Sequence, residues 1–289
     1  GKTTMNGPHQ GGWIHTKYSE DWFIHFQDKG PYGRVCHLQP VDWSSGWPVM
    51  GNAGEPYWKF RKPKSDSKTI VNPVETDEFD SSKLGMQWQW QNDYKESYGQ
   101  ATSMGFFRLF TYALPELGDV SNLWYVPNML LQKIPADEFT ATTKLSFCSR
   151  NSDQYVGLVC MSAEYSSVGL QRTEDGYELQ IRHNPNAMRT HLTDEVLTVD
   201  TLKPTQKGTP RKGRPAEMHI KDVYLRMSIK DSKVNYAYSI DGKKWKKAGG
   251  EYAMGKGRWI GSKIGFFAVD PNKTGRKGFI DIDWFRISR

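Results

Sequence analysis

The sequence predicts an all-β protein in two parts, a partial β-propeller blade followed by a jelly-roll β-sandwich. Short segments in which apolar and polar residues alternate recur at close spacing along the 289 residues. Helical periodicity is almost absent, and glycine, proline and Asp-Gly pairs separate the segments. A hydrophobic content of 37% and an aromatic content of 13% favour a folded chain over disorder.

Residues 1–51 form the blade segment. Trp22, Ile24 and Phe26 occupy alternate positions, which is the spacing of a strand, and Gly-Gly at 11–12 and Gly-Pro at 30–31 break the chain on either side. We expect three short antiparallel strands, with the stretch up to Met50 completing the blade. A single blade cannot bury its own face, so this segment needs neighbouring blades.

Residues 52–75 have a different composition. Three prolines and five basic residues stand in a stretch with little periodicity, which predicts an extended linker between domains. Tyr57, Trp58 and Phe60 indicate that the linker lies against a domain surface.

Residues 76–289 carry the pattern of the sandwich. Asp175-Gly176 and Asp241-Gly242 supply the backbone freedom at positive φ that tight hairpins need. Residues 190–219 show the least pattern and predict a long loop across one edge. The expected strands are 87–91, 105–112, 128–134, 140–148, 155–164, 168–173, 177–183, 223–230, 234–240, 264–269 and 279–287.

Several spaced motifs resemble one enzyme family. NGPHQGGW at 6–13, DWFIHFQDKGPYGRVCHLQP at 21–40 and WPVMG at 47–51 are similar to the last part of the five-bladed catalytic propeller of glycoside hydrolase family 43. That family holds β-xylosidases and α-L-arabinofuranosidases of plant polysaccharide breakdown. DEFDSSKLGMQWQW, YAYSIDGKKW and GFIDIDWFRI resemble the concanavalin A-like β-sandwich appended to many of these enzymes.

The resemblance implies that this chain is the C-terminal portion of a larger inverting glycosidase acting on xylosyl or arabinosyl linkages of hemicellulose. Such an enzyme needs a carboxylic acid and a carboxylate about 6.5–9.5 Å apart. In the family they lie on earlier blades. None of Glu20, Asp21, Asp28 and Asp42 stands at a catalytic position, and Glu20-Asp21 has the pattern of a solvated hairpin turn. We therefore assign no catalytic residue to this chain and expect it to be inactive without blades supplied in cis or by another chain.

Three residues of the blade segment are candidates for the pocket. The resemblance places Arg34 beside the sugar, where a guanidinium can hold a carboxylate and donate to hydroxyls. Tyr32 offers a stacking surface, and Gly33 permits close approach. His9 follows Gly-Pro, and in the family this histidine sits on the propeller axis, in several members at a calcium ion or its water shell. Since calcium prefers oxygen ligands, His9 would be a secondary ligand. The alternatives are a surface arginine and a hydrogen-bonded structural histidine.

A structural calcium is also possible in the sandwich. Asp281 and Asp283 share one face of the last strand and could meet Asp77 or Asp80 from the first. The alternative is that they face solvent or pair with lysine and arginine. The sequence calls for no organic cofactor.

The aromatic residues of the sandwich could have either of two roles, sugar binding or core packing. Trp88, Trp90, Trp124 and Tyr125 could stack on sugar rings, although core packing is favoured for Trp88 and Trp90. In some related β-xylosidases an aromatic residue from a sandwich loop reaches the propeller pocket. The sequence does not identify that residue here.

The charge and cysteine content restrict the remaining possibilities. The net charge of +7 is scattered, and its one concentration at residues 207–214 predicts a solvated loop, so we expect no nucleic-acid partner. No apolar run reaches the roughly 18 residues of a membrane span. Cys36, Cys148 and Cys160 predict free thiols, with a Cys148–Cys160 disulfide as the alternative.

The expected partner is a plant oligosaccharide or polysaccharide, and the expected location is periplasmic or secreted. The competing function is a non-catalytic accessory β-sandwich that binds carbohydrate or only supports the propeller.

Overall fold

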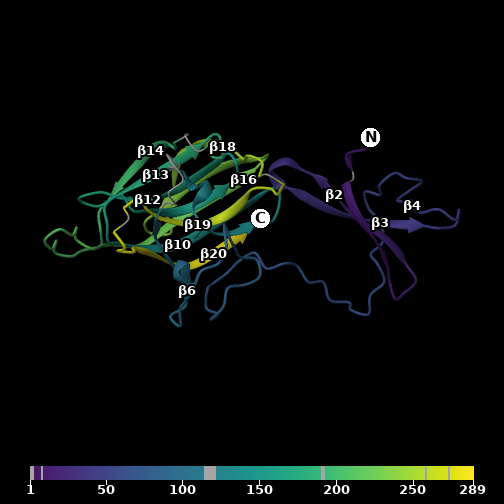
Figure 1. The fold of residues 1–289 in the computed structure, drawn as a ribbon, viewed down its shortest axis with the longest axis horizontal. Helices are drawn as coiled ribbons and strands as arrows, with labels where there is room; N and C mark the ends of the chain where they lie inside the picture. The colour runs from purple at the N-terminus through teal and green to yellow at the C-terminus, as the bar shows by residue number, and fades with distance from the viewer. Residues whose placement is uncertain (1–2, 8, 114–121, 190–192, 258, 273) are drawn as a thin grey trace.

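The computed structural model describes residues 3–7, 9–113, 122–189, 193–257, 259–272 and 274–289. Strands dominate, which confirms the all-β prediction, and a four-stranded N-terminal sheet lies at one end of a larger β-sandwich (Figure 1). The helices of the described residues are three 3₁₀ turns, η1 (Gly30–Tyr32), η2 (Glu96–Tyr98) and η3 (Leu123–Tyr125). None of them has the length and apolarity to span a bilayer.

The N-terminal sheet is an antiparallel meander in the order β1-β2-β3-β4. The hairpin between β2 and β3 points at the sandwich (Figure 1). Four strands is the number found in a propeller blade. Its members are β1 (His9–His15), β2 (Asp21–Asp28), β3 (Arg34–Asp42) and β4 (Val49–Met50).

The linker lies against this sheet, as its aromatic residues predicted. The Tyr57 N–H donates to Oε1 of Gln39 at 2.6 Å, and the Phe60 ring centroid lies 5.9 Å from that of the buried Trp22. The domain boundaries proposed at residues 51 and 75 stay predictions.

The sandwich consists of two sheets that enclose one core. The first sheet has the order β18-β17-β16-β10-β20-β7-β6, with β15 also paired to β16. Its strands are β6 (Gly99–Ala101), β7 (Phe107–Phe110), β10 (Phe139–Ser149), β15 (Gln206–Lys207), β16 (Met218–Lys230), β17 (Lys233–Ser239), β18 (Lys246–Ala253) and β20 (Phe279–Ser288).

The second sheet has the order β14-β13-β12-β11-β19-β9-β5, with β8 paired to β19 in parallel. Its strands are β5 (Gln89–Trp90), β8 (Tyr112–Ala113), β9 (Leu130–Lys133), β11 (Tyr155–Met161), β12 (Tyr165–Arg172), β13 (Tyr177–Asn184), β14 (Glu195–Leu202) and β19 (Lys263–Asp270).

Alternation along β10 builds the core from the first sheet. Phe139, Leu145 and Phe147 point inward and meet Val156 and Leu158 of β11 in one buried cluster. Burial of each such side chain stabilises the fold by about 1.5–3 kcal/mol.

The β11 strand of the second sheet is covered on both faces. Tyr155, Val159 and Met161 of β11 point away from the core into a second buried cluster, which includes Leu123 and Val126. This double burial explains the continuous apolar run of β11, because polar alternation is needed only where one face meets water.

The prediction of a loop over residues 190–219 is wrong in part. Its described residues include β14, β15 and the start of β16, and β18 was missed as well. β14 and β18 stand at the ends of their sheets. An edge strand has one neighbour and little burial, so it tolerates charge and exposed apolar residues and loses the alternating signature. Val196 and Leu197 of β14 are about half exposed.

Both predicted hairpins form, with β12 paired to β13 and β17 paired to β18. Gly242 has the positive φ that the pattern required, at 69°. Gly176 lies outside that region, because residues 173–176 close the turn as a longer loop, in which the Thr173 N–H donates to the Gly176 carbonyl at 3.0 Å.

Candidate functional site

Two of the predicted pocket residues meet around Phe26 in the N-terminal sheet. His9 is directly opposite Phe26 in the β1–β2 pair, and their ring centroids are 5.7 Å apart. Arg34 begins β3 and places its guanidinium carbon 4.6 Å from the Phe26 ring centroid, a cation–π contact. The tertiary fold thus brings together His9 and Arg34, 25 positions apart in the sequence, and we call His9, Phe26 and Arg34 the Phe26 cluster.

The charge of Arg34 is not neutralised by an ion pair within the described residues. Both Arg34 and His9 are exposed. The guanidinium contacts the Phe26 ring, and within the described residues no hydrogen bond occupies its N–H groups, so they can donate. A forked donor of this kind suits a carboxylate or the neighbouring hydroxyls of a sugar.

Tyr32 and Gly33 dock the N-terminal sheet onto the sandwich. The Tyr32 hydroxyl donates to the Asp137 carbonyl at 3.2 Å and accepts the Ser232 N–H at 3.0 Å. Gly33 has φ 79° and ψ −151°, and a Cβ there would lie 2.4 Å from the Gly261 nitrogen. Only glycine fits this backbone conformation and contact. The substrate role of Tyr32 stays a prediction, and its hydroxyl already has a partner on each side.

Residues 261–262, in the loop before β19, also contact η1. The Ser262 N–H donates to the Pro31 carbonyl at 2.7 Å, and Gly261 packs on the backbone of residues 31–33. Just before this contact the loop presents Trp259 and Ile260, which are 64% and 50% exposed. Trp259 is therefore the loop aromatic of the sandwich nearest in sequence to the contact with Gly33. Sequence reasoning missed it because its position depends on docking between segments more than 200 residues apart.

The predicted solvated turn at Glu20-Asp21 is wrong for Glu20, which is buried. Arg61 of the linker forms an ion pair with its carboxylate, and the Lys64 N–H donates to Oε2 at 2.8 Å. The Lys64 backbone hydrogen bond and then Arg61 lower the pKa of Glu20. Glu20 is buried because the linker folds back onto the N-terminal sheet, and no local sequence pattern predicts this contact.

The other acids of the N-terminal sheet also accept local hydrogen bonds. Asp21 accepts from the Trp13 indole at 2.8 Å and bonds the His15 ring at 2.9 Å, and these bonds, His15 first, lower its pKa. Asp28 accepts the Gly30 N–H at 2.8 Å, and Asp42 accepts that of Ser44 at 2.9 Å. The absence of a catalytic acid and base from this sheet stays a prediction.

The aspartates predicted for a sandwich calcium are engaged elsewhere. Asp281 accepts two bonds from the Arg108 guanidinium, at 2.7 and 2.8 Å, and Asp283 pairs with Lys144 at 2.9 Å. These ion pairs match the alternative expected from the sequence, in which the two aspartates pair with lysine and arginine. Asp77 accepts the Trp88 indole N–H at 2.7 Å, and Asp80 is exposed. The calcium stays a prediction.

Trp88 and Trp90 pack in the core, as favoured. Trp88 is buried between the sheets, and Trp90 packs half-buried on the same core. Trp124 packs against the second buried cluster. The three cysteines are free thiols, as predicted, with Cys148 and Cys160 buried and Cys36 exposed. Burial raises the pKa of both the Cys148 and the Cys160 thiol to about 12. The basic segment 207–214 is exposed throughout.

Residues 76–288 match the family model described as the β-xylosidase C-terminal concanavalin A-like domain of glycoside hydrolase family 43. The chain belongs to this family. The match begins at the residue where the sequence placed the start of the sandwich, and it confirms the resemblance.

Relatives extend the similarity across the N-terminal sheet. A β-xylosidase of Formosa agariphila is 27% identical over 96% of this chain and 47% of its own length. A non-reducing end α-L-arabinofuranosidase of Bacteroides ovatus is 23% identical over 72% of this chain and 35% of its own. The crystal structure of a glycoside hydrolase family 43 protein of Bacillus licheniformis superimposes with a TM-score of 0.74 at 25% identity, over 99% of this chain and 55% of that one. The chain spans about half the length of the curated relatives it matches.

Proposed function

We propose that this chain serves as the C-terminal part of a glycosidase that hydrolyses xylosyl or arabinosyl linkages of plant hemicellulose. In this proposal the N-terminal sheet closes a five-bladed propeller, and the catalytic carboxylates lie outside this chain. The relatives named above are a β-xylosidase and an α-L-arabinofuranosidase, which supports the substrate class. A plant oligosaccharide outside the cell would be the substrate, so we expect a periplasmic or secreted protein.

The Phe26 cluster is the observation that carries the proposal. Arg34 is exposed and fixed against the Phe26 face, with His9 on the other strand that borders β2. In an inverting mechanism the carboxylic acid protonates the leaving oxygen while the carboxylate activates a water on the opposite face of the sugar. Arg34 would donate to sugar hydroxyls or keep one carboxylate ionised and oriented, without transferring a proton itself.

The exposed faces of the N-terminal sheet support its place beside other blades. Large apolar side chains of β1 to β3 and of the β3–β4 turn remain in contact with water, and a face of this kind needs a neighbour. The exposed residues are Trp13 at 59%, Ile14 at 43%, Ile24 at 40%, Val35 at 40%, Leu38 at 38%, Trp43 at 40% and Trp47 at 74%.

Hydrolysis of aryl β-xyloside and aryl α-L-arabinofuranoside tests the proposal, with this chain alone and with the chain extended upstream through a complete propeller. We expect activity only in the extended protein. There Arg34→Ala should lower kcat/KM by about 10²–10³-fold, the usual cost of losing one charged or polar donor at the reacting centre. Arg214→Ala, in the exposed basic loop, is the control and should leave kcat/KM unchanged.

Two results would contradict the proposal. Hydrolysis by this chain alone would mean that its own carboxylates are catalytic. An extended protein that hydrolyses neither substrate, while this chain binds xylan, would favour the accessory carbohydrate-binding module.

A further inference from the structure

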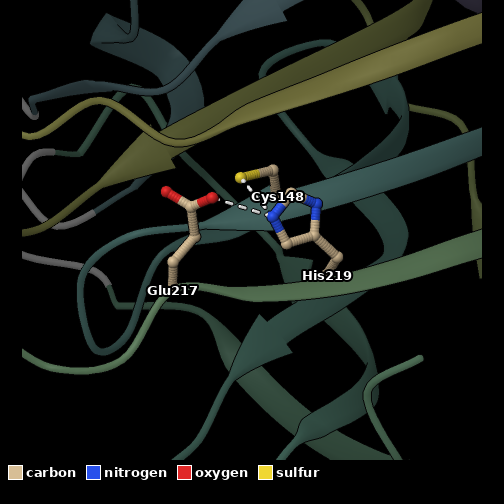
Figure 2. A group of neighbouring side chains, drawn as sticks. All are labelled: Cys148, Glu217 and His219. Carbon is tan, nitrogen blue, oxygen red and sulfur yellow. Dashed lines mark hydrogen bonds and ion pairs between the residues drawn. The ribbon is translucent and has the colours of Figure 1, made fainter. Parts of the chain in front are cut away.

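Three metal-ligating side chains converge on the outer face of the sandwich. Figure 2 shows Cys148 of β10, Glu217 just before β16 and His219 of β16 pointing toward one another. The Cys148 Sγ lies 3.5 Å from His219 Nε2, and His219 Nε2 lies 2.9 Å from Glu217 Oε1. One ligand atom of each residue lies within 4.8 Å of the others. We call these residues the Cys–Glu–His cluster.

Strand pairing fixes this arrangement. Cys148 and His219 are directly opposite each other in the β10–β16 ladder. The next pair, Phe147 and Ile220, is buried in the core cluster. Because side chains alternate across a sheet, Cys148 and His219 point to the other face. Their separation is therefore set by two paired central strands and not by a loop.

Neighbouring side chains orient Glu217 toward the other two ligands and leave space for a metal ion. The Arg150 Nε donates to Glu217 Oε2 at 2.7 Å, which turns Oε1 toward the cluster. Such an outer hydrogen bond to a carboxylate is common at metal sites. Cys148 and His219 also line a hollow of about 240 Å³. Three other acids line the hollow and are already paired, Asp281 with Arg108, and Asp222 and Asp283 with Lys144.

The donor set selects the metal. Calcium takes oxygen ligands, whereas a sulfur, an imidazole nitrogen and a carboxylate oxygen together suit zinc. Zinc bond lengths of about 2.3 Å to sulfur and about 2.0–2.1 Å to nitrogen, at tetrahedral angles, separate sulfur and nitrogen by about 3.6 Å. The observed 3.5 Å between Cys148 and His219 is close to that spacing. Glu217 Oε1 would move away from His219 Nε2 by only about 0.4 Å.

We propose that Cys148, Glu217 and His219 bind one Zn²⁺, with the fourth position open to water in the adjoining hollow. The ion would take the place of the hydrogen that now lies between His219 Nε2 and Glu217 Oε1. Cys148 would bind as a thiolate, and its thiol proton would be released to solvent. The site shares no residue with the Phe26 cluster of the N-terminal sheet, so it would be a separate site, located on the sandwich.

Equilibrium dialysis of this chain against Zn²⁺, with metal quantified by mass spectrometry, tests the site. We expect one zinc per chain and a rise in melting temperature of about 5–10 °C when Zn²⁺ exceeds its Kd about a hundredfold. Co²⁺ should give a thiolate-to-cobalt charge-transfer band. Cys148→Ser should abolish that band, and His219→Gln should weaken Zn²⁺ binding at least tenfold.

Cys160→Ser is the matched control, because Cys160 is an equally buried thiol of the opposite sheet. It should keep the stoichiometry and the cobalt band. Glu217→Gln lies at a half-exposed position and should fold even if the variants at buried positions do not. This substitution should weaken Zn²⁺ binding at least tenfold. Absence of stoichiometric Zn²⁺ and Co²⁺ binding would overturn the site. Zn²⁺ binding that survives in the Cys148→Ser, His219→Gln and Glu217→Gln proteins would also overturn the site. It would indicate that the metal binds elsewhere, with the exposed Cys36 as the first ligand to test.

Discussion

The N-terminal sheet and the sandwich are built from the same kind of strand but differ in what covers them. Leu145 of β10 is 1% exposed, whereas Leu38 of β3 is 38% exposed. In the sandwich two sheets face each other and enclose one core. Among the described residues no second sheet faces the N-terminal sheet, and the linker covers part of it. An alternating pattern therefore specifies a strand, but only a second layer turns it into a core.

In the part of the chain that the structure describes, the N-terminal sheet contacts the sandwich around η1. Tyr32 and Gly33 dock on Ser232 and on the loop that ends at Ser262. Arg34 follows Gly33 directly, so this contact places the start of β3 beside the sandwich. It gives the sandwich a physical role in positioning the Phe26 cluster.

A matched pair of leucine truncations should give the largest difference. Leu145→Ala removes a fully buried side chain from the core and should lower the free energy of unfolding by about 2–5 kcal/mol. Leu38→Ala should cost less than about 1 kcal/mol, because much of the side chain is already in water. Chemical denaturation followed by circular dichroism measures both. Equal costs would show that the N-terminal sheet is packed in solution, which would break the comparison.

Gly33→Ala should separate the two parts. Its Cβ would lie 2.4 Å from the Gly261 nitrogen, and its φ of 79° adds about 1–3 kcal/mol of backbone strain. We expect hydrogen exchange at the Ser232 and Ser262 amides to rise at least tenfold, since both donate to residues 31–32. Gly46→Ala is the control, with φ 77° and nothing within 4 Å of its Cβ. Unchanged amide protection from exchange in the Gly33→Ala protein would mean that the backbone around Gly261 shifts to accommodate the added Cβ.

Glu20→Gln should loosen the linker from the N-terminal sheet. The lowered pKa of Glu20 means that its ionised form stabilises the fold. That contribution is fully present above the ordinary value of 4.5 and is lost as the pH falls through the lowered pKa. We expect residues 52–75 to be cleaved severalfold faster at pH 7 in the variant, by limited proteolysis. Glu55→Gln, at an exposed linker position, should leave the rate unchanged, and a similar increase there would contradict a specific role for Glu20.

Asp241→Asn should give the smallest effect. The Lys244 and then the Lys243 backbone N–H lower the pKa of Asp241 to about 2. Its stabilising contribution is present above the ordinary value of 3.8 and is lost as the pH falls toward 2. The melting temperature at pH 7 should fall by no more than about 2 °C. The difference in melting temperature between the variant and the parent chain should disappear as the pH drops. A constant difference from pH 7 to pH 2 would show that ionisation of Asp241 does not stabilise the fold.

Sequence reasoning succeeded where the signal is local or spans a motif. The inward positions of β10 and β11 follow from alternation and apolar runs, and the family follows from several motifs in order. It failed for β14 and β18, because edge strands carry little hydrophobic pattern. His9 and Arg34 were both named from the resemblance. Phe26, which joins them, was seen only as a strand residue.

By itself the sequence determined the all-β class, most strands of the sandwich and the family of the chain. Period-two alternation and turn residues act within a few positions, so they can be read locally. Only the tertiary structure decided that Glu20 is buried, that Tyr32 docks on the sandwich and that Cys148 meets His219. These contacts join residues 41 to 200 positions apart, and strand order and docking, which no local pattern encodes, set them.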